Sequence, residues 1–236
     1  MKQNLSPYQK PDRVDGGEPG EPKLRLSVMA LSSLIYGAMS LTALLIMWFW
    51  HANITSSFVP PQDPKEIARL AGIGLLAAGV LLIASHLFED WFRSYRRLRN
   101  LIMRLLGGIS APGAIYLAML SAIGEELLFR GAIQPFAGLF LTSIMFGLLH
   151  VGPDGKISAW SFWTMLAGLL LGYMYEQTGS LMAPMLTHFA VNTYSLLRLR
   201  RLYGRFLDGV EVQLGKDSSA EADATPGKKA DPDLKN

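Results

Sequence analysis

The sequence ISAPGAIYLAMLSAIGEELLFRGAIQPFAGLFLTSIMFGLLHV, residues 109–151, decides how this chain must fold. It holds three charged residues, Glu125, Glu126 and Arg130, inside a stretch long and apolar enough for two crossings of a bilayer. An ionised side chain within a bilayer is costly, so it usually faces the interior of a helix bundle and serves a function. These three residues are therefore the first candidates for a buried polar site.

The composition of the whole chain indicates a membrane protein. Half of the 236 residues are hydrophobic and 17% are charged, whereas soluble domains carry about 25% charged residues. Six apolar runs are close to the length that a bilayer core requires. They lie at about 27–50, 70–88, 109–129, 133–151, 157–175 and 180–197. The sequence therefore predicts an all-α protein, a polytopic transmembrane helical bundle of about six spans.

Four regions are expected along the chain. The predicted regions are a disordered N-terminal tail at 1–26, two spans with a basic loop at 27–108, a catalytic helical core at 109–200 and a polar tail at 201–236. The first tail is rich in Pro, Gly and charge, so it cannot bury enough apolar surface to fold alone. The chain has no cysteine, which excludes disulfides, thiolate metal ligands and a cysteine nucleophile.

Arginine-rich segments at 93–99 and 198–205 lie directly beside apolar spans. Because such clusters mark the cytoplasmic ends of membrane helices, we expect a multi-pass integral membrane protein with both termini in the cytoplasm. A net charge of +3 and a pI of about 9.1 could suggest nucleic acid as a partner. The position of the basic residues favours membrane lipid instead, and we expect no nucleic-acid partner.

The boundaries of the third span have two interpretations. Residues 104–110 could form an interfacial segment, in which case the helix would run from about Pro112 through Arg130 towards Gln134. The acidic pair would then lie past the middle of the helix. The depth of the site in the membrane depends on this choice.

Glu125 and Glu126 should divide their roles. Adjacent residues on a helix diverge by about 100°, so only one carboxylate can point straight into a given pocket. Arg130 follows Glu126 by four residues and should pair with it on the same helix face. That pairing would lower the cost of burying both charges and leave Glu125 free to act as a general base.

Two histidines and an amide complete the candidate site. His150 follows Phe146 by four residues near the end of the fourth span, and Asn192 follows His188 by four residues in the sixth. Residues four apart share a helix face. An imidazole, taken as neutral, and a side-chain amide are donors suited to an oxyanion.

Taken in order, these motifs resemble the CPBP family of intramembrane proteases, also called the CAAX protease and bacteriocin-processing or Abi family. The family pattern is Glu-Glu-x-x-x-Arg, then Phe-x-x-x-His, then His-x-x-x-Asn. The matching residues are Glu125, Glu126, Arg130, Phe146, His150, His188 and Asn192. The resemblance covers roughly residues 110–197 and leaves the first two spans and both tails unaccounted for.

The resemblance implies an intramembrane endopeptidase acting on membrane-associated proteins or peptides, which can be lipid-modified. Eukaryotic members remove the last three residues of prenylated CAAX proteins. By resemblance, Glu125 activates the attacking water and His150 assists it. His188 and Asn192 would then stabilise the oxyanion. Glu126 is grouped with the catalytic residues, whereas Arg130 and Phe146 are expected to support the site.

A metal cofactor is left open by the sequence. Glu125, His150 and His188 could ligate Zn²⁺ with one position free, as in catalytic zinc sites. The family is commonly labelled metalloprotease, while another account has glutamate and histidine working without metal. The chain has no His-Glu-x-x-His helix, so ligands from three helices would have to be brought together by tertiary packing.

Two alternatives to the enzyme are also open. A non-catalytic membrane scaffold or bacteriocin-immunity protein could keep the polar cluster for structure, although a scaffold needs no general base. A small transporter could use a Glu/His proton relay, but it gives no reason for the Glu-Glu-x-x-x-Arg motif.

Overall fold

The computed structural model describes residues 22–50, 61–151 and 155–223. The helices are α1 (Pro22–Phe49), α3 (Pro64–Trp91), α4 (Arg93–Leu106), α5 (Ala111–Glu126), the π-helix η1 (Leu127–Ile133), α6 (Gln134–Leu149), α7 (Ala159–Thr178) and α8 (Met182–Asp223). No strand occurs in these ranges, so the all-α prediction is confirmed. Most of the predicted N-terminal tail, residues 1–21, lies outside the described residues, as do residues 224–236.

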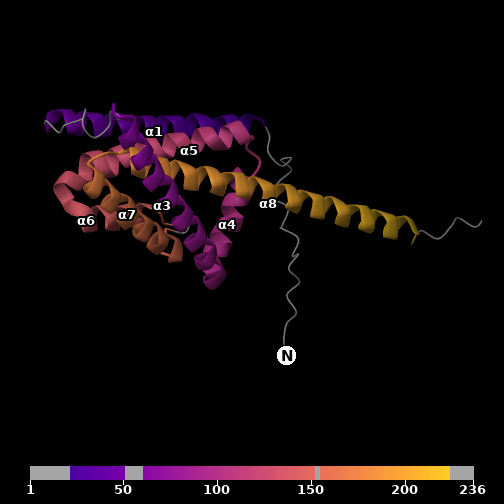
Figure 1. Ribbon diagram of the computed structural model, residues 1–236. Coiled ribbons are helices and arrows are strands. Elements are labelled where there is room, and N and C mark those ends of the chain that lie inside the picture. The colour runs from indigo at the N-terminus through magenta and orange to yellow at the C-terminus, as the bar shows by residue number, and fades with distance from the viewer. Residues whose placement is uncertain (1–21, 51–60, 152–154, 224–236) are drawn as a thin grey trace, which may run out of the picture.

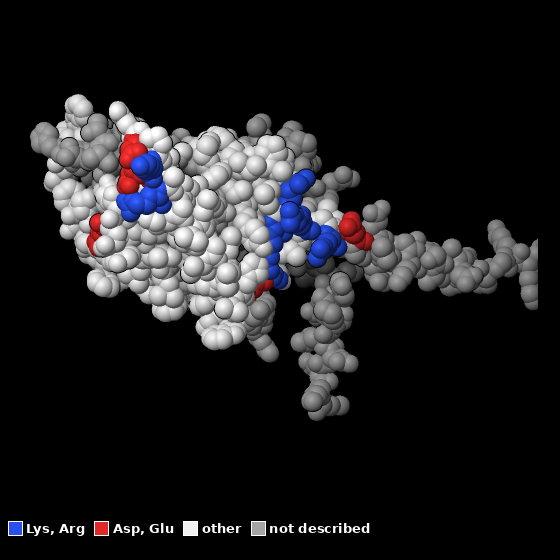
Figure 2. All heavy atoms as spheres, viewed as in Figure 1, with Lys and Arg blue, Asp and Glu red and all other residues white. Residues whose placement is uncertain are grey.

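Three of the described helices are long and apolar enough to cross a membrane. They are Val28–Phe49, Pro64–Glu89 and Ala111–Leu149. Large apolar side chains are exposed on the outward faces of these helices. For example, Leu34 is 70% exposed and Leu76 is 75% exposed. On the face shown in Figure 2, the charged side chains gather mainly in two patches, near the start of α3 and beside α8, with an uncharged surface between them. This pattern is that of a helical membrane bundle.

The helical segment that contains the third predicted span, 109–129, is longer than that span. Helix α5 continues through η1 into α6, and the backbone leaves helical geometry only at Gly138, where φ is 74° and ψ is 168°. This conformation is open essentially to glycine alone. The interpretation in which the helix runs from about Pro112 through Arg130 towards Gln134 is therefore the correct one. It places the acidic pair in the last turn of α5.

Where a basic loop is predicted between the second and third spans, the structure has the helix α4. Apolar residues recur on it at helical spacing, at Leu98, Leu101, Ile102 and Leu105. Arginines occupy many of the other positions, so the segment is an amphipathic helix rather than a loop. Its packing against α3, α7 and α8 supplies the burial that holds it in place.

Helix α8 is the centre of the bundle. It packs against α3, α4, α5 and α7, and Figure 1 shows its C-terminal part extending past the other helices. Where the catalytic core is predicted to end, at residue 200, the helix continues without a break to Asp223. The part of α8 that crosses the bundle carries His188 and Asn192, which it brings opposite the end of α5.

Candidate functional site

A cavity of about 170 Å³ lies where the helices of the bundle meet. This volume is enough for several water molecules. Its walls come from α1, α3, α5, α6, α7 and α8. The polar side chains that line it are Tyr36, Glu125, His150, Thr164, His188 and Asn192. The structure thus brings Glu125, both candidate histidines and the candidate amide to one cavity.

The acidic pair lies where α5 passes into η1. Both carboxylates are buried, with Glu125 7% exposed and Glu126 fully enclosed. Glu125 lines the cavity and Glu126 does not. Because neighbouring helical residues point about 100° apart, the two side chains have different partners, as their adjacency predicts.

Glu126 belongs to a charge network behind the cavity. Its Oε1 accepts hydrogen bonds from Arg130 Nη1 at 3.0 Å and from His188 Nδ1 at 2.7 Å. Arg130 is also fully buried, and its guanidinium carbon lies 4.6 Å from the centre of the Phe146 ring. The Glu126–Arg130 pair has the four-residue spacing predicted for it. Phe146 therefore packs against the site and also contributes a cation–π contact.

Helix α7 meets this network through two backbone carbonyls and through the side chain of Glu176, whose Oε1 accepts from Gln134 Nε2 at 3.2 Å. Arg130 Nη2 donates to the carbonyl of Gly168 at 3.1 Å, and Gln134 Nε2 donates to the carbonyl of Gly172 at 3.0 Å. A Cβ atom on Gly168 would lie 3.2 Å from the Phe146 ring, and one on Gly172 would lie 2.6 Å from Gln134 Oε1. The two glycines therefore allow the buried polar side chains to reach the α7 backbone.

Glu125 faces both imidazoles across the cavity. Its Oε2 lies 3.7 Å from His150 Nε2 and 3.8 Å from His188 Nε2. This oxygen is buried and has no hydrogen-bond partner among the described residues. Because buried polar atoms are normally satisfied, the oxygen is suited to bind a water molecule or a polar group of a ligand.

Each imidazole is oriented by a hydrogen bond at Nδ1. His150 Nδ1 lies 2.7 Å from the carbonyl oxygen of Phe146, which can only accept, so this nitrogen carries the hydrogen. His188 Nδ1 lies 2.7 Å from Glu126, whose pairing with Arg130 keeps it an acceptor, so the same assignment follows. Both Nε2 atoms are thereby directed at Glu125.

Asn192 lies one turn after His188 on α8. Its Nδ2 donates to Ser121 Oγ at 2.9 Å, and Ser121 Oγ donates to the carbonyl of Ala118 at 3.1 Å. A primary amide has two N–H groups. One is donated to Ser121, and the second has no partner among the residues that the structure describes, so it can serve a group bound in the cavity.

Tyr36 and Ser121 are two members of the site that the motifs do not include. Tyr36 comes from α1, lines the cavity and interacts with the Glu125 carboxylate. It lies in an otherwise apolar span far from the motifs in sequence, so no local pattern points to it. Ser121 precedes Glu125 by four residues, and this spacing on one helix face could have indicated it.

The predicted Zn²⁺ ligands are Glu125, His150 and His188. One carboxylate and two imidazole nitrogens are donors that zinc accepts. Within residues 22–50, 61–151 and 155–223, however, no three or more His, Cys, Asp or Glu side chains are arranged to hold a metal ion. Zinc binding by Glu125, His150 and His188 stays a prediction.

Comparison with known proteins adds a family match to this geometry. A family model described as type II CAAX prenyl endopeptidase Rce1-like matches residues 107–194, which contain every motif residue of the site. The uncharacterized protein YpbD of Bacillus subtilis (strain 168) is 33% identical over 150 residues, or 59% of this chain and 78% of YpbD. No solved structure gives a significant match.

Proposed function

The chain belongs to the Rce1-like family of type II CAAX prenyl endopeptidases, and from this membership and its site we propose that it hydrolyses peptide bonds within the membrane. It is an integral membrane protein with long apolar helices. The proposed substrates are membrane-associated proteins or peptides, including lipid-modified ones. The proposed nucleophile is a water molecule activated by Glu125. A multi-pass arrangement with both termini in the cytoplasm is part of the same proposal.

The observation that carries this proposal is the position of Glu125 Oε2. A buried carboxylate oxygen with no hydrogen-bond partner in the described part of the chain faces two imidazole nitrogens at 3.7 and 3.8 Å across a cavity that has room for water. A general base must lie within hydrogen-bond reach of the proton it removes, directly or through one water. A water bound to Oε2 meets this requirement.

The proposed reaction starts with proton transfer from water to Glu125. His150 Nε2, which has a free lone pair in the assigned tautomer, accepts the second hydrogen of that water and orients it. The hydroxide adds to the scissile carbonyl carbon. Glu125 then returns the proton to the leaving nitrogen, and the C–N bond breaks to give a carboxylic acid and an amine.

The oxyanion is proposed to be held by His188 and Asn192. Because His188 Nδ1–H is already donated to Glu126, Nε2 can donate only if the imidazole is protonated. The neutral imidazole expected from the sequence is therefore replaced by an imidazolium in this mechanism. The charges of Glu125, Glu126, Arg130 and His188 then sum to zero, which lowers the cost of burying them together.

Replacing Asn192 by Ala tests the oxyanion assignment. We expect kcat to fall by about 100-fold with little change in KM, because this donor would act on charge that develops in the transition state. The measurement is cleavage of a farnesylated CAAX peptide by full-length protein in proteoliposomes. Thr193→Ala is the matched control, since Thr193 is the next residue on α8 and lines neither of the described cavities. Equal rates for the two variants would remove Asn192 from the mechanism.

The proposed mechanism uses protein groups alone, so we expect purified protein to keep its cleavage rate after exhaustive treatment with a chelator. The metal content of the same sample would be measured by mass spectrometry. One zinc per chain whose removal abolishes cleavage, and whose return restores it, would contradict this mechanism. It would place Glu125, His150 and His188 as ligands instead.

The rival function is a non-catalytic scaffold or immunity protein in the same membrane. The position of Glu125 favours the enzyme, because its carboxylate lines a cavity with room for water and faces both imidazoles, an arrangement that a structural ion pair does not need. The Glu125→Gln variant separates the two functions. A scaffold would keep its biological activity in that variant, whereas an endopeptidase would lose it.

A further inference from the structure

Tyr36 lines the cavity, but the proposed mechanism gives it no role. It is half-buried on α1 and faces the same space as Glu125. Its hydroxyl interacts with the Glu125 carboxylate as a hydrogen-bond donor. Tyr36 lies outside residues 107–194, the part of the chain that the family model matches. The first predicted span therefore reaches the proposed active site, although it carries none of the motifs.

Helix α1 approaches the acidic pair closely because a glycine precedes that pair. A Cβ atom on Gly124 would lie 3.1 Å from the backbone oxygen of Tyr36 and 3.2 Å from its Cδ1. An alanine at this position would therefore push α1 or the tyrosine ring away, since packed helices have little room to yield. Glu125 follows Gly124 directly. The close approach of the two helices thus sets the tyrosine beside the carboxylate.

Contacts on both sides of Tyr36 hold this part of α1 in place. About one turn earlier, Ser33 Oγ and the hydroxyl of Tyr116 lie 2.9 Å apart and link α1 to α5. About two turns later, Ala43 and Met47 are buried in an apolar cluster that includes residues of η1. Because the helix is fixed before and after Tyr36, packing of the backbone and not the hydroxyl alone determines where this side chain lies.

The other polar groups that line the cavity have partners elsewhere. Thr164 Oγ1 donates to backbone carbonyls of its own helix, and Asn192 donates to a serine of α5. His150 and His188 are held through Nδ1 by other groups. Their Nε2 atoms lie 3.7 and 3.8 Å from Glu125 Oε2, which is longer than a hydrogen bond. Among the described residues, Tyr36 is therefore the lining side chain that remains to orient this carboxylate.

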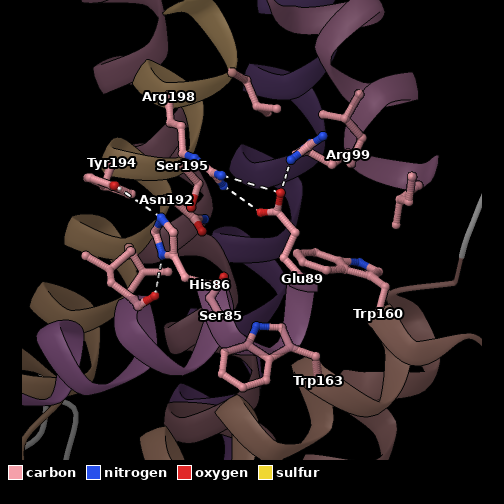
Figure 3. Close-up of a pocket in the computed structure, with 15 residues that line it drawn as sticks. Ser85, His86, Glu89, Arg99, Trp160, Trp163, Asn192, Tyr194, Ser195 and Arg198 are labelled. Carbon is pink, nitrogen blue, oxygen red and sulfur yellow. Dashed lines mark hydrogen bonds and ion pairs between the residues drawn. The ribbon is translucent and has the colours of Figure 1, made fainter. Parts of the chain in front are cut away.

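A second cavity, of about 120 Å³, adjoins the first beside Asn192 and supplies no further donor to it. Figure 3 shows that Glu89 lies between Arg99 and Arg198. Arg198 donates to both oxygens of Glu89, and Arg99 contacts Glu89 and also donates to Asn100. Both guanidinium groups thus have partners of their own on this side.

We propose that Tyr36 is a positioning residue, which donates its hydroxyl hydrogen to the Glu125 carboxylate and so keeps Oε2 directed at the two imidazoles. This inference rests on the proposed function, in which Glu125 is the base. A carboxylate in a cavity has several rotamers, and the base acts only from the one that faces the bound water. A hydrogen bond to the charged group stabilises that rotamer. Oε2 itself has no hydrogen-bond partner among the described residues, so it stays open to water.

A purely structural role for the Tyr36 hydroxyl makes a different prediction. It could serve only to dock α1, as the Tyr116 hydroxyl does through Ser33. Its removal would then lower the stability and leave the rate of each folded molecule unchanged. Tyr116→Phe is the matched control, because it removes the same atom from the same pair of helices at a position that lines neither cavity.

The test is cleavage of a farnesylated CAAX peptide by full-length protein in proteoliposomes. Tyr36→Phe should lower kcat by about 10- to 100-fold, because a hydrogen bond to a charged group is lost. KM should change little, since the hydroxyl acts on the base and not on the substrate. Tyr116→Phe should cleave at the wild-type rate. In Glu125→Gln protein, adding Tyr36→Phe should change the residual single-turnover rate by less than about twofold, because effects that act through one group are not additive.

The outcomes separate the positioning role from the endopeptidase. Equal kcat for Tyr36→Phe and Tyr116→Phe, with an active wild type, would overturn the positioning role and leave the proposed function intact. The same fold-loss from Tyr36→Phe with and without the Glu125 carboxylate would also overturn it, and would assign the hydroxyl to the substrate. Cleavage by none of the proteins would count against the endopeptidase, and the inference would then be decided by spectroscopy.

Infrared difference spectroscopy tests the hydrogen bond without any cleavage. The carboxylate stretching bands of Glu125 are identified by their loss in Glu125→Gln. They should shift in Tyr36→Phe, because a hydrogen bond changes the vibrations of the group that accepts it, and they should stay in place in Tyr116→Phe. Unchanged bands in Tyr36→Phe would overturn the inference. Thermal unfolding is recorded in parallel, and we expect Tyr36→Phe to remain folded because the packing of α1 against Gly124 does not involve the hydroxyl.

Discussion

Glu125→Gln is expected to reduce the cleavage rate of a farnesylated CAAX peptide by about 10²- to 10⁴-fold, the usual contribution of a general base. Glutamine keeps the size of the side chain and its oxygen but cannot take the proton of the attacking water. KM should change little, since the substrate would bind before the proton moves. The measurement is single-turnover cleavage by full-length protein in proteoliposomes.

The control for this variant is Glu176→Gln. It makes the same chemical change on α7 at an exposed position outside the cavity. We expect it to cleave at the wild-type rate. If Glu125→Gln kept more than half of the wild-type rate while remaining folded, another group would have to be the base.

Arg130→Met should produce the largest loss of stability among single substitutions in the site. Arg130 is fully buried, and its removal leaves Glu126 and the carbonyl of Gly168 without their partner. Breaking one side of a buried ion pair usually costs about 3–5 kcal/mol. The free energy of unfolding would be measured by denaturant titration in mixed micelles.

Arg69→Met is the matched control for Arg130→Met. Arg69 forms an ion pair with Glu66, but both side chains are largely accessible to solvent, 51% and 35% exposed. Exposed pairs contribute little, so this variant should unfold almost as the wild type does. Adding Glu126→Gln to Arg130→Met should recover part of the loss, because it removes the uncompensated charge. Equal unfolding of Arg130→Met and Arg69→Met would show that the buried pair is not a stabilising element.

The boundaries of the spans illustrate what sequence patterns could predict. Apolar runs place the long apolar helices in order, because a long uncharged stretch has few alternatives to a helix in a membrane, but they do not indicate the amphipathic helix α4. The apolar runs did not predict where the chain leaves helical geometry between the third and fourth predicted spans. This point lies at Gly138 rather than near residue 130. The π-helix at Leu127–Ile133 carries the chain past the charged residues, and no hydrophobicity pattern distinguishes it from ordinary helix.

Sequence alone determined the class of protein and the short list of chemical groups, because hydrophobicity and motif spacing are local properties of the chain. Tertiary packing decided which groups share the cavity. It turned Glu125 towards the two imidazoles and Glu126 towards Arg130, added Tyr36 from a distant helix, and joined Glu89, Arg99 and Arg198 beside the site. These contacts depend on how each helix is rotated and on the angles at which the helices cross. Those quantities are set by packing between helices that are far apart in the sequence, so no local sequence pattern predicts them.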